Sequence, residues 1–201
     1  MSKHHMSVFA NEQDCLAALL QLHNGGRDID LDPMYFKGGF YRGKVNRPKL
    51  TYDLVPRDEL VIEGNAECLP LESESVSCMV LDPLFLFGIH GKADKYYTSS
   101  TMGILKDFAA LEQHYKAILT EARRLLKING VLTFKCQDYT DSKTTMTHSL
   151  VYNWAVERGF YAKDLSILNI PQTKVYNPNL TQRHLRKTHC YFWVFIKRRQ
   201  R

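Results

Sequence analysis

Apolar residues recur every three or four positions in three segments, and this spacing predicts three amphipathic helices. The helices span about residues 11–23, 108–128 and 147–158. The middle one has the most regular apolar face: Phe108, Leu111, Tyr115, Ile118, Leu119, Ala122, Leu125 and Leu126. Asp107 is positioned to cap its start, and Asn129-Gly130 predicts its end.

Shorter runs of β-branched and aromatic residues, bounded by turn residues, predict strands between and after these helices. The expected strands are residues 28–33, 49–55, 59–63, 76–81, 131–136, 160–168 and 190–196. Alternation of strands and helices is typical of an α/β fold with a mostly parallel sheet. No helical pattern separates the last two strands, so we expect them to form an antiparallel pair.

A carboxylate and a proline follow directly on the predicted buried strand 76–81, in the sequence Asp82-Pro83-Leu84-Phe85. A carboxylate at the end of a buried strand is costly unless something there uses it. Pro83 ends the strand, so the adjoining carbonyl can be directed at a ligand. Together with the flat face of Phe85, these acceptors suit a planar group that carries an amine. The alternative is structural: Asp82 caps the next turn and Phe85 belongs to the core.

The same four residues resemble the Asp-Pro-Pro-Tyr/Phe signature of S-adenosylmethionine-dependent amino-methyltransferases. The resemblance implies that Asp82 and the carbonyl of Pro83 accept hydrogen bonds from the target amine, and that Phe85 stacks on the base. Leu84 stands where the family usually has a second proline, which predicts a looser loop.

A cofactor site is a further implication of this resemblance. Asn65 and Ala66 follow strand 59–63 and resemble the Gly-Asp/Asn-Ala turn that contacts the cofactor's adenine. An acid at an earlier strand end usually binds the ribose, for which Asp53 is the first candidate and two earlier acids are rivals. The glycine pair in residues 34–41 would permit close approach of a ligand, although ordinary turn chemistry is the alternative throughout. The residues implied for cofactor binding are Asp30, Asp32, Gly38, Gly39, Phe40, Asp53, Asn65 and Ala66.

Polar groups also follow the strand 131–136. The preceding Leu-Lys-Ile-Asn-Gly resembles the LKPGG link to the fifth strand of class I methyltransferases, and the strand here ends Lys135-Cys136-Gln137-Asp138. Ligands of open α/β sheets bind at the carboxyl ends of the strands. We therefore expect Lys135, Gln137 and Asp138 near the substrate. Alternatively, Lys135 extends to solvent and Asp138 caps the next turn.

Three longer stretches, residues 126–138, 159–168 and 183–195, together resemble a family of small phage and bacterial DNA methylases. That family carries a KCQD strand end and a terminal HARKxHSYFWVF-like stretch, where Leu185 and Cys190 replace the usual Ala and Ser. Its opening LDPxYxKGxFY stretch resembles residues 30–41. The resemblance covers about residues 28–197 and implies an α/β, class I (Rossmann-like) methyltransferase fold. That fold has a mostly parallel sheet, an antiparallel last strand and helices on both faces.

Positive charge is concentrated near the end of the chain. The net charge is +6, and residues 165–201 hold eight Lys or Arg and no acid. This predicts a polyanionic partner, DNA first and RNA as the alternative, although a solvated tail would look the same. Arg183, Arg186, Lys187 and His189 are expected to meet phosphates. The polar residues 91–102 are expected to form a loop over the site or a connector.

Length and composition predict a single domain over all 201 residues, with residues 1–10 flexible and residues 197–201 a basic tail. The resemblance implies that this is a methyltransferase domain. The five scattered cysteines include no C-x-x-C pair, so we expect neither a disulfide framework nor a zinc site. No apolar run approaches the ~20 residues of a membrane helix, and the start lacks a secretory signal. A cytoplasmic protein with no membrane contact is expected.

These patterns and resemblances together predict an S-adenosylmethionine-dependent DNA methyltransferase that acts on the exocyclic amine of adenine or cytosine. The base would be flipped out of the duplex, and no metal is needed. Two alternatives stay open: a methyltransferase of RNA bases, and a relative that binds cofactor or nucleic acid but whose Leu84 loop no longer positions a base.

Overall fold

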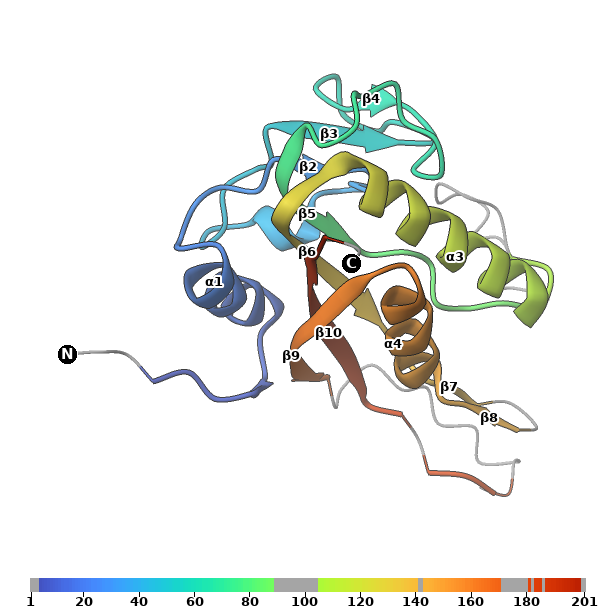
Figure 1. Ribbon diagram of the computed structural model, residues 1–201. Coiled ribbons are helices and arrows are strands. Elements are labelled where there is room, and N and C mark those ends of the chain that lie inside the picture. Colours follow the sequence, from blue (N-terminus) through green and yellow to red (C-terminus); the bar gives the residue numbers. More distant parts are fainter. Residues whose placement is uncertain are drawn as a thin grey trace.

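A mixed β-sheet lies at the centre of the computed structural model (Figure 1). The structure describes residues 4–88, 105–140, 143–170, 181, 183–185 and 187–199. In this part of the chain eight strands form the sheet, in the order β1-β9-β10-β6-β5-β2-β3-β4. They are β1 (Val8–Phe9), β2 (Leu31–Asp32), β3 (Leu50–Asp53), β4 (Ile62–Glu63), β5 (Val76–Leu81), β6 (Leu126–Cys136), β9 (Phe160–Asn169) and β10 (His189–Lys197).

The strand directions agree with the sequence prediction. β5 pairs in parallel with β2 and β6, and the parallel pairing continues through β3 to β4. β10 inserts between β6 and β9 and is antiparallel to both. The predicted mostly parallel sheet with an antiparallel last strand is therefore confirmed. The carboxyl ends of β2, β3, β5 and β6 consequently meet at one edge of the sheet.

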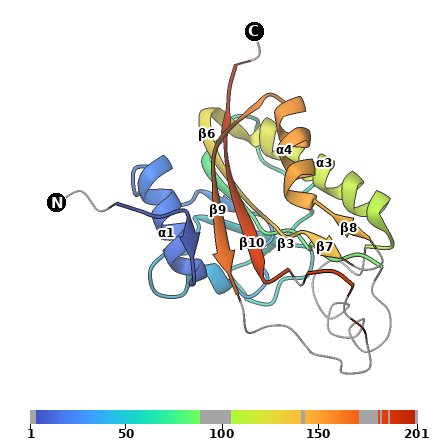
Figure 2. The same cartoon turned by 90° about the horizontal axis from the view of Figure 1, so that it is seen from below.

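Helices cover both faces of the sheet, as predicted. α1 (Glu12–His23) lies on one face, and α3 (Phe108–Leu125) and α4 (Thr147–Glu157) lie on the other (Figures 1 and 2). Alternate residues of β5 supply the two cores, because successive side chains of a strand point to opposite faces. Met79 and Leu81 pack with the core of α3 and α4, whereas Cys78 and Val80 pack with that of α1.

Side-chain caps explain where two of these helices begin. The side chain of Asn11 accepts a hydrogen bond from the backbone N–H of Asp14 at 3.0 Å, and Asp107 accepts one from that of Ala110 at 2.9 Å. Each bond satisfies an otherwise unpaired N–H of the first turn. The cap at Asp107 matches the sequence prediction, and the helix that Asn11 caps begins where it was expected.

The end of α3 differs from the prediction. The helix stops at Leu125 and β6 begins at Leu126, so Asn129-Gly130 lies inside a strand and is not the helix stop. The pairing of β6 with β5 shifts register between Val76 and Cys78, which leaves residues 127–130 as an irregular segment within β6. Asn129 has a φ of 64°, a left-handed conformation that Asn tolerates better than most residues.

Strands in the first third of the chain are shorter than predicted. Residues 28–33, 49–55 and 59–63 contain only the short strands β2, β3 and β4. In the last of these, Asp58 accepts from the N–H of Leu60 at 2.8 Å and so holds a turn where a strand was expected. An Asp side chain commonly bonds the backbone two residues ahead in this way.

Some structure falls where none was predicted. Val8–Phe9, expected to be loose, pairs with β9 as β1. A small hairpin, β7 (Tyr139–Thr140) and β8 (Thr144–Thr145), follows β6. Lys197, expected to begin an exposed tail, is buried at the end of β10. Within the described residues, no helix combines the length and the apolar character needed to cross a membrane.

Candidate active site

A cavity of about 440 Å³ opens where the carboxyl ends of β2, β3, β5 and β6 meet. Most of the site residues predicted from the sequence line it. These are Asp32, Gly39, Phe40, Asp53, Asn65, Ala66, Asp82, Pro83, Leu84, Phe85 and Lys135. The sheet therefore brings together residues that are up to 103 positions apart in the chain (Asp32 to Lys135).

Asp82 and Lys135 form an ion pair on the wall of this cavity. Asp82 directly follows β5, and Lys135 is the penultimate residue of the neighbouring parallel strand β6. Lys135 Nζ lies 3.1 Å from Asp82 Oδ2. The same ammonium group lies 2.6 Å from Glu12 Oε1, at the start of α1, and 4.8 Å from the ring centroid of Phe40. Glu12 was not predicted as a site residue, because an acid in the first turn of a helix is ordinary.

Burial shifts the pKa values of this pair. Burial raises the pKa of Asp82 above its ordinary value, and the neighbouring Lys135 opposes that rise. For Lys135 burial lowers the pKa, but Asp82 and Glu12 outweigh this effect and hold it above its ordinary value. An ammonium ion is therefore fixed beside the carboxylate at neutral pH.

The loop after Asp82 is anchored from α3. The hydroxyl of Tyr115, a fully buried residue, donates to the backbone carbonyl of Leu84 at 3.2 Å. Leu84 and Phe85 then pass along the cavity wall. Tyr115 was predicted only as a core residue, since its place in the apolar face of the helix does not reveal the hydroxyl contact.

Two buried acids hold the loop of residues 33–41 against the cavity. Asp32 accepts from the N–H of Met34 at 2.8 Å and from the hydroxyl of Tyr41 at 2.6 Å. Asp53 accepts from the N–H of Phe36 at 2.8 Å. Burial raises the pKa of Asp32 to about 7 and also raises the pKa of Asp53.

The two adjacent glycines of this loop, Gly38 and Gly39, have different structural roles. Gly39 begins the short 3₁₀ helix η1 (Gly39–Tyr41) and lines the cavity. Gly38 lies outside the lining and has a φ of 61°, and a Cβ at this position would collide with the ring and hydroxyl of Tyr35. Gly38 therefore shapes the loop, because a larger residue would be both strained and obstructed.

Asn65 and Ala66 follow β4 and reach the cavity in a tight turn. The Asn65 side-chain oxygen accepts from the N–H of Glu67 at 2.9 Å. The same Glu67 extends its carboxylate to α3, where Oε1 lies 2.6 Å from His114 Nδ1. Turn and helix are thus tied together at one end of the cavity.

His114 is a cavity residue that the sequence prediction missed. It is 3% exposed and lines the cavity, and its Nε2 atom is buried without a hydrogen-bond partner in the described structure. A signal was present: His114 lies three positions after Leu111 and four before Ile118, within the apolar face of the helix. A histidine at such a position needs a partner for both ring nitrogens.

Asp30, one of the predicted rivals for ribose binding, is not part of the cavity. Its Oδ2 accepts from the N–H groups of Ser77 and Cys78 at 2.7 and 3.2 Å, and Oδ1 lies 2.7 Å from Lys49 Nζ. Because Ser77 and Cys78 are near the start of β5, Asp30 faces away from the edge that carries Asp82. The bonds of Asp30 tie the residue before β2 to the start of β5, so its role here is structural.

Gln137, Asp138 and His189 also lie outside the cavity and form a cluster of their own beyond β6. The Gln137 amide donates to the carbonyl of His189 at 3.1 Å. Asp138 Oδ1 lies 2.8 Å from His148 Nδ1 and accepts from the His148 N–H at 3.2 Å, near the start of α4. Asp138 therefore binds the first turn of α4, ten positions along the chain, and neither the predicted substrate cavity nor the turn that directly follows it.

The predicted phosphate-binding residues are described only in part. Arg183 is exposed and Lys187 is half-buried, and neither lines the cavity. Arg186 and residues 91–102, the expected loop over the site, lie outside the described residues.

Comparison with known proteins reveals a shared fold. No family model and no curated protein sequence matches the chain. Among solved structures, 1,6-didemethyltoxoflavin-N1-methyltransferase from Burkholderia thailandensis, with bound 1,6-didemethyltoxoflavin and S-adenosylhomocysteine, has a TM-score of 0.57 at 13% identity over 94% of this chain and 80% of that one. TrmN from Thermus thermophilus has a TM-score of 0.51 at 16% identity over 92% of this chain and 48% of its own. The fold is that of class I methyltransferases.

A more remote likeness is to a provisionally named DNA modification methylase, also from Thermus thermophilus. Its TM-score is 0.44 at 15% identity, over 65% of this chain and 48% of that one. The chain thus spans about half the length of both Thermus proteins. At these identities the likeness concerns the fold, and the chemistry has to be argued from the site itself.

Proposed function

We propose that the chain is an S-adenosylmethionine-dependent methyltransferase that acts on the exocyclic amine of adenine or cytosine in DNA. The observation that supports this most is the place of Asp82-Pro83-Leu84-Phe85. The four residues follow β5 and line the same cavity as Asn65 and Ala66. The groups suited to hold an amine and those suited to hold a nucleoside thus share one cavity.

The donor set of the cavity fits the proposed cofactor. Asp53 could accept from ribose hydroxyls, and Asn65 and Ala66 adjoin the place for an adenine. The unpartnered His114 Nε2 is the observation that tests the fit. If Nδ1–H donates to Glu67, Nε2 is an acceptor, and the adenine amine is a donor of matching chemistry. When bound, S-adenosylmethionine supplies a methyl group activated by a positively charged sulfur.

Residues of the chain itself would hold and orient the target amine. Asp82 and the carbonyl of Pro83 would accept the two amine hydrogens and so orient the nitrogen lone pair, while Phe85 would stack on the base. Lys135 opposes the rise that burial causes in the pKa of Asp82, and Glu12 gives Lys135 a second partner when the amine approaches. A carboxylate whose pKa is raised by burial can also accept the proton that the amine loses.

DNA is the proposed substrate and RNA is the alternative, since either can present an unpaired base to such a cavity. Charge supports a polyanion of this kind: residues 165–201 contain eight Lys or Arg and no acid. Arg183, Arg186, Lys187 and His189 remain the proposed phosphate contacts.

The test is transfer of a labelled methyl group from S-adenosylmethionine to unmethylated DNA, with RNA in parallel. Asp82→Asn keeps the shape of the side chain but removes its charge, so we expect transfer to fall by roughly 100-fold or more. S-adenosylhomocysteine affinity, measured by calorimetry, should change little. Glu59→Gln, at an exposed acid outside the cavity, is the control.

Each result has a definite consequence. Label in DNA that depends on Asp82 supports the proposal, and digestion to nucleosides identifies the base. Label in RNA alone replaces DNA with the alternative substrate. Cofactor binding without transfer to either nucleic acid contradicts the proposal and favours a binding protein, for which Leu84→Pro is the next variant to make.

A further inference from the structure

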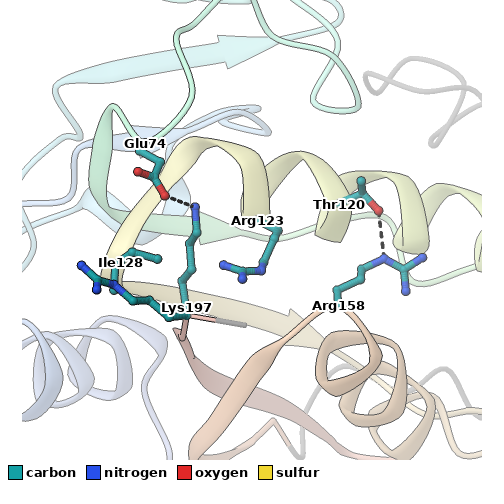
Figure 3. Close-up of a pocket in the computed structure, with 7 residues that line it drawn as sticks. Glu74, Thr120, Arg123, Ile128, Arg158 and Lys197 are labelled. Carbon is teal, nitrogen blue, oxygen red and sulfur yellow. Dashed lines mark hydrogen bonds and ion pairs between the residues drawn. The ribbon is translucent and has the colours of Figure 1, made fainter. Parts of the chain in front are cut away.

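A second cavity, of about 550 Å³, lies at the opposite edge of the sheet (Figure 3). Lys197, the last residue of β10, donates to the carbonyl of Leu126, the first residue of β6, at 2.6 Å. The same ammonium lies 2.9 Å from Glu74, two residues before β5. The cavity is thus placed at the amino ends of β5 and β6, whereas the candidate active site lies at their carboxyl ends.

Its walls carry four basic side chains and one acidic one. The basic residues are Arg123, Arg158, Lys197 and Arg199, and the acid is Glu74. Since Glu74 pairs with Lys197, the three arginines have no carboxylate partner among the residues that line this cavity. We call these five residues the basic groove.

The arginines come from separate elements and converge here. In Figure 3 the Arg123 side chain extends from α3 into the space between Lys197 and Arg158. Arg158 is held at the end of α4, where Nε donates to Thr120 Oγ1 at 2.9 Å. Arg199 follows β10 and is exposed.

Arg123 has unused hydrogen-bonding capacity. Its Nη2 donates to the carbonyl of Arg198 at 2.8 Å, but Nη1 is buried and has no partner in the described structure. A buried charged donor without an acceptor is unfavourable. Burial likewise lowers the pKa of Arg158, with Glu157 opposing the shift, although this side chain donates to Lys116, Thr120 and Trp154. The unused donor of Arg123 is therefore the observation that indicates an acceptor from outside the described chain.

We propose that the basic groove binds phosphate groups of a nucleic acid, at a site separate from the active-site cavity. Guanidinium groups match phosphate oxygens in charge and in their paired donors. Because the groove is at the opposite edge of the sheet, its phosphates belong to a segment other than the one that presents the target base. Extended nucleic acids should therefore bind more tightly than ones that fill a single site.

The choice of ligand rests on the proposed nucleic-acid substrate, but methyl transfer is not required. The experiment uses the full-length chain and measures binding alone, by fluorescence anisotropy, with a labelled short duplex and a much longer one. Affinity is recorded over a range of salt concentrations. A calorimetric titration with S-adenosylhomocysteine checks, in each variant, that the other edge of the sheet is intact.

We expect the double variant Arg123→Gln/Arg199→Gln to lower affinity for the long duplex several-fold. We also expect the slope of log affinity against log salt to decrease by about two, one for each lost cation. Arg199→Gln alone should decrease the slope by about one, and this variant guards against misfolding because the side chain is exposed. Lys163→Gln, at an exposed lysine of β9 that does not line the groove, is the matched control.

Three outcomes would overturn the proposal. One is an unchanged salt slope in both groove variants, and another is an equal loss in the Lys163 control. The third is competition by inorganic tripolyphosphate for the groove with no effect of the variants on DNA affinity, which would indicate a site for small phosphates. A chain that transfers no methyl group but still shows the groove effect would contradict only the proposed function.

Discussion

Asp32 is a carboxyl group that the fold removes from water, with 2% of its surface exposed. Burial raises the pKa of this group to about 7 in the folded chain, whereas an unfolded chain has a value of about 3.9. Between these two values the folded state keeps a proton that the unfolded state has lost. Its contribution to stability is therefore greatest at low pH, falls as pH rises through this window, and is constant above it.

Asp32→Asn should remove that dependence, because the amide has a similar shape and does not titrate. The free energy of unfolding of the variant, relative to the original chain, should rise by on the order of 4 kcal/mol from about pH 4 to about pH 8. Urea unfolding over this range measures the difference, with Glu59→Gln as the exposed control. Parallel stability profiles for the Asn variant and the original chain would refute the assignment.

His114 is the second residue whose environment leads to a testable prediction, because its buried Nε2 has no hydrogen-bond partner in the described structure. If its unpartnered Nε2 bonds the cofactor, His114→Phe should weaken S-adenosylhomocysteine binding by about 1 kcal/mol, roughly fivefold. His114→Gln can restore an acceptor and should recover part of the affinity. Calorimetry measures the S-adenosylhomocysteine affinity of each variant. His23→Gln is the control, since His23 pairs with Asp164 and lies outside the cavity. Equal affinity in the Phe variant would leave Nε2 without this role.

At the scale of elements, the sequence predicted α3 well but misplaced its end. Caps and apolar spacing depend on nearby residues, so the cap at Asp107 and the buried face of the helix could be predicted from the sequence. The junction depends on pairing with β5, whose Val76 lies 50 positions before its partner Leu126, and that pairing extends β6 back to Leu126. The same reason explains the site: Asp82 and Asn65 were found at strand ends, whereas Glu12 and His114 reach it from helices.

The conformation of Asn129 makes this junction testable. With a φ of 64°, alanine there should lower the free energy of unfolding by about 1 kcal/mol, because a Cβ is crowded in the left-handed region. Asn129→Gly should cost less, since glycine adopts that φ without strain. Thermal unfolding compares the two, with Lys127→Ala as an exposed control. If the two Asn129 variants were equally stable, the turn would not depend on positive φ.

For the molecule as a whole, charge is where sequence and structure differ most. The sequence assigns the positive excess to residues 165–201, yet Arg123 and Arg158 come from outside that segment and join Lys197 and Arg199 in space. Linear counting could not predict this, because helix packing and the return of β10 create the juxtaposition. The strand directions, by contrast, followed from the α/β pattern and the resemblance, and the position of the site at the carboxyl ends of the parallel strands followed from those directions.

Two ligands at opposite edges of one sheet should stabilise the fold independently. A ligand at about 100 times its Kd adds about 2.7 kcal/mol, or a rise of roughly 5–10 °C in Tm for a chain of this size. With S-adenosylhomocysteine and a long duplex together, the rise should be close to the sum of the separate rises. Arg199→Gln should reduce only the duplex contribution, and Asp53→Asn only that of S-adenosylhomocysteine. A combined rise no greater than the larger single one would mean that the two ligands compete, which would contradict independent binding.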